Sequence, residues 1–242
     1  MAAFPFRRVL IATPSASVDL ELLRYGAQMA ALGPGGQVVV GLPPTPDHEH
    51  PADVSLDQVR ALAPGMTASH LPLAGVDADS LCAGTRDARA DVLITRHPLR
   101  WPGGPAIVRR LIDGCAAPVW LVPAGARVPI RRVVAERARP GREAAFTCAQ
   151  AVSLSASAAL LDPATTSDDG PSAMRSLIDA ATRHDADLLV VNRRHPGPDA
   201  HDQSGADIDD LCALTATALL VVPPASAPPS GWRALARFGR RS

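Results

Sequence analysis

Residues 90–94 read ADVLI and residues 186–190 read ADLLV, and this repeated stretch decides the fold. Two further pairs of segments match in the same order along the chain: RRVL at 7–10 with RRVV at 131–134, and PVWLVP at 118–123 with ALLVVP at 218–223. Three ordered matches indicate that the chain contains two copies of one structural pattern. The spacing between the matches is smaller in the second copy, which predicts that this copy is the shorter one.

The repeated segments are short and uniformly apolar, without the alternation of a strand that has one wet face. Such runs are typical of strands buried on both faces, and these belong to parallel sheets covered by helices. Helical patterns lie between them, at residues 20–29, 78–90, 106–113 and 141–152, and again from about Pro171. Strands that alternate with helices predict right-handed crossovers. The predicted fold class is therefore α/β, with two doubly wound, open parallel sheets of which the second is shortened.

A Gly- and Pro-containing stretch, residues 125–129, is the best boundary between the copies. We predict a first domain at 1–125, a second, reduced domain at 130–224 and a flexible Pro/Arg-rich tail at 225–242. The second copy has far fewer residues between its second strand, at 156–161, and its next helix, so we expect it to lack an edge strand and a helix. Trp232, Leu235 and Phe238 have helical spacing, so the alternative for the tail is a helix that docks on a partner or a membrane surface.

Composition excludes several classes of function. The formal net charge is zero and the pI is about 7.1, which speaks against nucleic acid as a partner. All 24 basic residues are Arg, which removes Schiff-base and Walker-lysine chemistry. The four cysteines lie far apart without a CxxC pair, as expected for reduced, buried thiols of a cytoplasmic protein. No apolar run approaches the ~20 residues of a membrane span, and we interpret residues 1–14 as leading into a first strand.

The residues that follow the repeated strands resemble one known family. Residues 91–98 (DVLITRHP) precede a helix and the strand at 117–123, and residues 187–195 (DLLVVNRRH) precede a helix and the strand at 217–223. Both units resemble the C-terminal half of a universal stress protein domain, which reads D-L-[IV]-V-[MV]-G-S-[RH]-G and closes with a P-V-L-V-V strand. The resemblance implies the adenine nucleotide alpha hydrolase-like fold, a role in stress response and two halves packed as a pseudo-dimer through their last strands. A homodimer and an unidentified protein partner are compatible with it.

Nucleotide-binding members of that family carry G-x-x-G, nine residues, and G-[ST], because glycines let backbone N–H groups approach the phosphates at a helix N-terminus. In the second copy this spacing is kept by Asn192, His195 and Gly205, with Ala206 in place of the hydroxyl. Gly104 and Gly114 also have the spacing. We place Gly114 at the C-terminal end of a helix, however, where the dipole disfavours phosphate.

In the first copy, Thr95, Arg96 and His97 stand at the corresponding loop, and Gly103 and Gly104 precede Pro105 at the start of the helix. The family also has an Asp just after its first strand. The first copy has Thr13, Pro14 and Ser15 there, and the second has Arg-Ala-Arg at 137–139, so we expect both copies to lack this carboxylate.

These losses predict a non-enzymatic stress-response or regulatory protein that does not bind ATP in the usual mode, with no cofactor, catalytic residue or metal. The first alternative is an ATP- or AMP-binding protein that uses Thr13, the end of the second strand at Val40 and the loop 95–104. The second is a nucleotide hydrolase of the same fold group. The candidate nucleotide-binding residues are Thr13, Val40, Thr95, Arg96, His97, Gly103, Gly104, Asn192, His195 and Gly205. His48-Glu49-His50 is interpreted as a solvated loop, because no third metal ligand is apparent.

Overall fold

The computed structural model describes residues 4–13, 19–43, 51–97, 104–137, 143–161, 171–193 and 217–223. The elements of the N-terminal half are β1 (Arg8–Ala12), α1 (Leu20–Ala31), β2 (Gln37–Leu42), α2 (Pro51–Leu62), β3 (Thr67–Pro72), α3 (Ala78–Asp87), β4 (Val92–Arg96), α4 (Gly104–Gly114) and β5 (Val119–Val122). Those of the C-terminal half are β6 (Arg132–Ala135), α5 (Ala144–Ala156), β7 (Ala159–Leu161), α6 (Pro171–Arg183), β8 (Leu188–Asn192) and β9 (Ala218–Val222).

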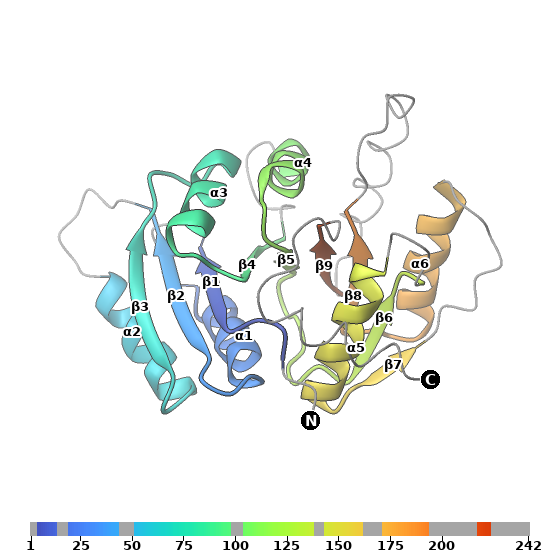
Figure 1. Ribbon diagram of the computed structural model, residues 1–242, viewed down its shortest axis with the longest axis horizontal. Coiled ribbons are helices and arrows are strands. Elements are labelled where there is room, and N and C mark those ends of the chain that lie inside the picture. The colour runs from blue at the N-terminus through green and yellow to red at the C-terminus, as the bar shows by residue number, and fades with distance from the viewer. Residues whose placement is uncertain are drawn as a thin grey trace.

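One sheet runs through the described part of the chain, in the strand order β3-β2-β1-β4-β5-β9-β8-β6-β7 (Figure 1). Neighbouring strands within each half pair in parallel, which confirms the predicted α/β class. The sheets of the two halves are joined through their last strands, as the family resemblance implies, because β5 and β9 pair antiparallel with Trp120 opposite Leu220. This pairing satisfies the backbone N–H and C=O groups that each half would otherwise leave exposed at an open edge.

The two halves have related strand orders. β6, β8 and β9 take the places that β1, β4 and β5 take in the N-terminal half, and β7 takes the place of β2. The residues between β7 and α6, 162–170, lie outside the described residues, so the expected loss of an edge strand and a helix there stays a prediction. The division of the chain into two domains stays a prediction, because a single sheet connects the halves.

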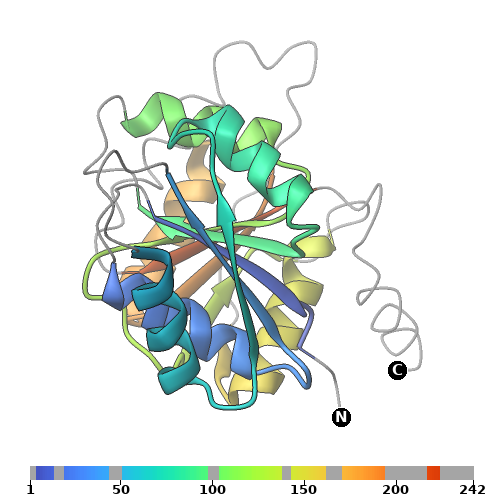
Figure 2. The ribbon, with the colours of Figure 1, turned by 90° about the vertical axis from the view of Figure 1, so that its left-hand side faces the viewer.

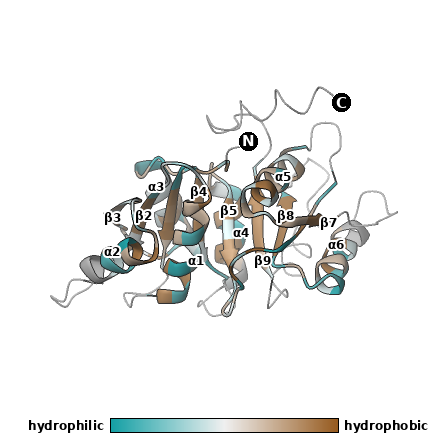
Figure 3. Ribbon diagram, turned by 90° about the horizontal axis from the view of Figure 1, so that it is seen from below, coloured by the Kyte–Doolittle hydropathy of each residue, from teal (hydrophilic) through white to brown (hydrophobic). Residues whose placement is uncertain are grey.

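Helices cover both faces of this sheet. One apolar cluster joins the strands to α1, α2 and α5, and the other joins them to α3, α4 and α6 (Figure 2). In β1, Val9 and Ile11 belong to the first cluster, whereas Leu10 and Ala12 belong to the second. The strands are therefore hydrophobic along most of their length (Figure 3), and this explains their unbroken apolar sequences.

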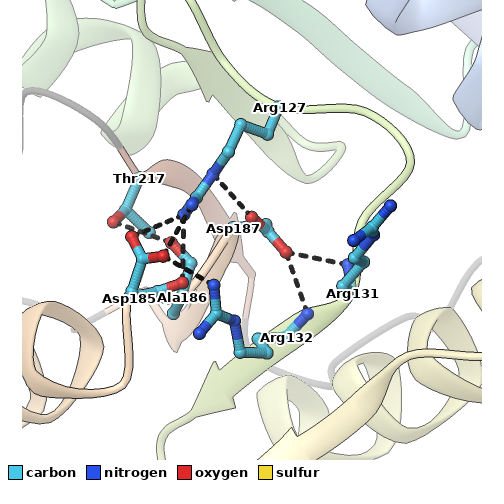
Figure 4. Close-up of polar contacts among 7 residues, drawn as sticks. All are labelled: Arg127, Arg131, Arg132, Asp185, Ala186, Asp187 and Thr217. Atoms are coloured by element: carbon cyan, nitrogen blue, oxygen red, sulfur yellow. Dashed lines mark hydrogen bonds and ion pairs between the residues drawn. The ribbon is translucent and has the colours of Figure 1, made fainter.

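An aspartate at the start of a strand makes the same contact in each half. Before β4, a carboxylate oxygen of Asp91 accepts the backbone N–H groups of Arg7 and Arg8, at 2.9 Å each. Before β8, Asp187 accepts those of the residues at 131 and 132, at 2.8 and 3.0 Å (Figure 4). The repeated Ala-Asp sequence thus makes the same polar contact in both halves. Each contact fixes the first strand of its half beside the strand that follows the Asp.

Asp187 has one partner more than Asp91. Its second oxygen lies 2.9 Å from Nε of Arg127, which comes from the connection between the halves (Figure 4). The Asp187 side chain is only 4% exposed, while that of Arg127 is 44% exposed. Arg127 also contacts the exposed carboxylate of Asp185 at 2.7 Å, so the connection is attached to the C-terminal half at two points.

Candidate functional site

The carboxyl ends of β1 and β4 lie side by side in the N-terminal half, and open α/β sheets bind their ligands at such ends. Thr13, directly after β1, is fully buried, and its N–H donates to the Gly41 carbonyl at 3.2 Å. Thr95, in β4, is also buried, and its hydroxyl donates to the Ala12 carbonyl at 2.9 Å. The Thr13 amide and the Thr95 hydroxyl are thus bonded within the sheet.

Arg96 is the last residue of β4, and its guanidinium group is bound by the protein's own acceptors. Two of its nitrogens, Nε and one Nη, each lie 2.5 Å from a carboxylate oxygen of Asp19. Further N–H groups donate to Glu21 at 2.9 Å and to the Pro123 carbonyl at 3.0 Å. The Arg96 side chain is 14% exposed. A forked, charge-assisted pair of this kind is strong and geometrically specific.

Asp19 links this ion pair to the start of α1. It is the N-cap residue of the helix, and its side chain accepts the Leu22 N–H at 3.0 Å. Burial acts to raise the pKa of Asp19, but the hydrogen bonds from Arg96 and from the Leu22 amide hold that pKa below its ordinary value. The strand end, the helix start and the segment after β5 are therefore tied together by charged groups.

The other predicted residues of the N-terminal half have different positions. His97 follows β4, is buried, and donates its backbone N–H to the Val122 carbonyl at 2.9 Å. Gly104 is the first residue of α4. Val40 was expected to end its strand, but β2 continues to Leu42, so Val40 lies inside the sheet. Gly41 and Leu42 remain in the strand because they pair with β3.

Asn192 ends β8 and has a role in the C-terminal half like that of Arg96. Its Oδ1 accepts the N–H of Ala145 in the first turn of α5 at 3.0 Å. Its backbone N–H and its Nδ2 donate to one carboxylate oxygen of Glu136, at 2.8 and 3.1 Å. In both halves the last residue of the strand is thus bonded to the start of the helix that follows the first strand.

Glu136 was missed by the sequence analysis. We expected no carboxylate after the first strand of the C-terminal half, because residues 137–139 were assigned to the turn; Glu136 directly follows β6 and supplies one. Asp19 and Glu21 supply carboxylates to the N-terminal half from the start of α1. The sequence shows Glu136 as a carboxylate at the end of a predicted strand, but its partner Asn192 lies far away in the chain.

Three of the predicted site residues, Gly103, His195 and Gly205, lie outside the described residues.

Arg193, beside Asn192, points away from this group of contacts. One of its Nη groups donates to the carbonyl oxygen of Cys115, just after α4. Burial lowers the pKa of Arg193 from its ordinary value. Across the seven described ranges, no three His, Cys, Asp or Glu side chains lie together as metal ligands would. Nor does any helix in those ranges have the length and apolar character needed to cross a membrane.

Comparison with solved structures identifies the fold. The chain matches a putative universal stress protein from Pseudomonas aeruginosa UCBPP-PA14 with a TM-score of 0.67 and 14% identity, over 98% of each chain. It matches a universal stress protein from Archaeoglobus fulgidus DSM 4304 with a TM-score of 0.64 and 11% identity, over 90% of this chain and 96% of that one. A functionally unknown protein from Pseudomonas aeruginosa PAO1 matches with a TM-score of 0.68 and 13% identity, over 96% and 98%.

These matches extend over nearly the whole chain, and at such low identities they establish a shared fold. The protein therefore has the fold of universal stress proteins. No protein-family model and no curated protein matches its sequence.

Proposed function

We propose that the chain is a non-enzymatic regulatory protein with two units of the universal stress protein type, and that it does not bind ATP in the usual mode of that family. One observation carries the proposal. The strand-final residues Arg96 and Asn192, which stand where the family has the first glycine of its phosphate loop, are bonded to the protein's own helix starts.

The charge at the carboxyl ends of β1 and β4 also opposes the binding of a polyphosphate. The single Arg96 guanidinium is shared between two carboxylates, Asp19 and Glu21. These three groups together carry a net negative charge, so a phosphate chain would meet repulsion and would have to displace Asp19 to reach Arg96. Glu136 places another carboxylate at the corresponding strand ends of the C-terminal half.

The proposal that the protein is no enzyme rests on the same residues. Thr95 donates its hydroxyl to a backbone carbonyl, and Arg96 is held in an ion pair. A hydroxyl nucleophile needs an adjacent base that accepts its proton. In the contacts that the structure shows at the carboxyl ends of β1 and β4, the acceptor of the Thr95 hydroxyl proton is the Ala12 carbonyl, which is no general base.

Calorimetric titration of the purified chain with Mg-ATP and with AMP tests the proposal. We expect no heat of binding up to millimolar nucleotide, and no release of phosphate from ATP. Micromolar binding at one site per chain would overturn it. If that binding were lost in Arg96→Ala and kept in Asn192→Ala, it would establish a nucleotide site in the N-terminal half. Phosphate release at a rate proportional to protein concentration would overturn the non-enzymatic assignment.

A further inference from the structure

Two buried thiols meet on the face of the sheet that α3 and α4 cover. Cys82 lies in α3 and Cys115 directly follows α4, and they are 6% and 1% exposed. The Cys115 sulfur lies 3.7 Å from the Thr85 hydroxyl oxygen, and the Cys82 sulfur lies 4.0 Å from the Leu111 carbonyl oxygen. The two residues meet at the Leu111 carbonyl, which lies against the Cys82 sulfur and accepts the Cys115 backbone N–H.

The close approach follows from the helix packing. Thr85 is three residues after Cys82 on the same face of α3, so both side chains face the end of α4. The Cys115 N–H donates to Leu111 at 3.0 Å, which keeps Cys115 against the last turn of α4. Gly114 leaves room there, since a Cβ at this position would lie 3.5 Å from the Cys82 sulfur. The two sulfurs are therefore held together by regular secondary structure.

The surroundings of the two sulfurs differ. The neighbouring Cys82 thiol lowers the pKa of Cys115 below its ordinary value, although burial opposes this. Thr85, the Ala117 amide and the Arg193 charge act in the same direction as Cys82. The neighbouring Cys115 thiol and burial raise the pKa of Cys82, so Cys115 is the more acidic thiol of the pair.

Several charged groups surround the pair. Arg193 reaches the site from the C-terminal half and binds the Cys115 carbonyl, and its Nε is buried with no hydrogen-bond acceptor among the described residues. On α3, the Arg86 charge lowers the pKa of Cys82, whereas the Asp79 carboxylate raises it. The Asp113 carboxylate raises the pKa of Arg193, against the lowering by burial. A buried guanidinium with an unused N–H stabilises an anion nearby, and the neighbouring Cys115 sulfur is such a group.

We propose that Cys82 and Cys115 form a dithiol site that reacts with hydrogen peroxide and closes to an intramolecular disulfide. The thiolate of Cys115 attacks one peroxide oxygen, the O–O bond breaks, and the leaving oxygen takes up a proton to form water. The product is a sulfenic acid on Cys115. The Cys82 sulfur then attacks the Cys115 sulfur, its proton passes to the departing hydroxyl, and a second water leaves. The two sulfurs lose two electrons in total, and one peroxide is reduced to two waters.

Burial selects the oxidant. With Cys82 6% exposed and Cys115 1% exposed, burial keeps out a bulky disulfide such as oxidised glutathione, so we expect the oxidant to be a molecule of the size of hydrogen peroxide. Cys148 provides the contrast within the same chain. It is equally buried in α5, and burial alone raises the pKa of its thiol. We therefore expect Cys148 to be inert.

The experiment uses the full, reduced chain, treated with hydrogen peroxide, quenched in acid, denatured and alkylated. We expect two of the four thiols to be lost, a mass decrease of two hydrogens that dithiothreitol reverses, and a crosslinked peptide pair that contains Cys82 and Cys115. Cys148→Ser is the matched control and should form the disulfide at the wild-type rate. Oxidised glutathione should leave both thiols free.

The single variants separate the two roles. Cys82→Ser should accumulate a sulfenic acid on residue 115 that dimedone traps, whereas Cys115→Ser should show neither disulfide nor trapped adduct. Circular dichroism checks that each variant is folded, and the wild-type peptide map decides the question if a variant is not. The proposal is overturned if all four thiols survive peroxide that oxidises the denatured chain. A crosslink through another cysteine, or between two chains, would overturn it equally.

Discussion

Replacing Asp187 by Ala tests whether the connection between the halves is held by the ion pair with Arg127 or only by the strand contact beneath it. The substitution removes three contacts of a carboxylate that is 4% exposed: the Arg127 ion pair at 2.9 Å and the backbone bonds at 2.8 and 3.0 Å. Asp91→Ala is the matched control, because it removes the two backbone bonds and no ion pair that the structure shows.

The magnitudes follow from the number of contacts. Two charge-assisted bonds to backbone amides are worth about 3 kcal/mol together, so we expect Asp91→Ala to lower the free energy of unfolding by about that amount. The ion pair adds about 1 kcal/mol, since Arg127 is half in solvent and screened. Asp187→Ala should therefore cost about 4 kcal/mol, and Arg127→Ala about 1 kcal/mol. For a chain of this size, the largest loss corresponds to a fall in melting temperature of about 10 °C.

Urea unfolding followed by circular dichroism measures all three variants. A double variant of Arg127 and Asp187 should be no less stable than Asp187→Ala alone, because the partner is already gone. Asp185→Asn, which suits the positive φ of this position, removes only exposed ion pairs with Arg127 and Arg132 and should leave the unfolding midpoint nearly unchanged. Equal losses for Asp91→Ala and Asp187→Ala would show that the ion pair does not stabilise the fold. A loss below 1 kcal/mol for Asp187→Ala would refute the reasoning as a whole.

Two further perturbations follow from other contacts. Because Asp19 has a lowered pKa in the folded chain, its carboxylate contributes stability that is fully present above the ordinary Asp pKa and is lost as pH falls through the lowered value. Asp19→Asn should therefore be less stable than wild type at pH 7, and the difference should shrink as the pH falls below the ordinary Asp pKa; stability curves that stay parallel would contradict the role of Arg96. Gly36→Ala should destabilise by about 2 kcal/mol, as in other overpacked sites, because its Cβ would lie 2.3 Å from the Ala30 carbonyl oxygen. Gly35→Ala meets no neighbouring atom and suffers only from its positive φ, so thermal melts should rank Gly36→Ala as the more damaging change.

Strands buried on both faces were the predictable part of the fold. β4 and β8 carry unbroken apolar runs because helices cover both sides of them. β3, by contrast, reads TASHLP and was not located, because it is a largely exposed edge strand held by backbone pairing with β2. The antiparallel pairing of β5 with β9 agrees with the packing through last strands that the family resemblance implies; the strand sequences alone do not state which neighbour each will have.

The candidate site shows the same limit for side chains. Arginine at position 96 was recognisable as a charged group at a strand end, but its partner Asp19 lies 77 positions away and is brought there by the fold. The sequence likewise predicted separate thiols, because Cys82 and Cys115 are far apart in the chain. They meet because α3 and α4 pack side by side, and no local spacing encodes that contact.

The antiparallel pairing of β5 with β9 limits how copies of this chain can assemble. Each of these strands already has a hydrogen-bonded neighbour on both sides. A second copy therefore cannot extend the sheet through them, because the pairing of last strands that the resemblance implies is already made between the two halves. Among the described residues, the strands at the two edges of the sheet are the polar β3 and the three-residue β7. An assembly that joins β3 of one copy to β7 of the next would grow head to tail, whereas a closed symmetric pair would have to join like edges across a twofold axis or form through helices.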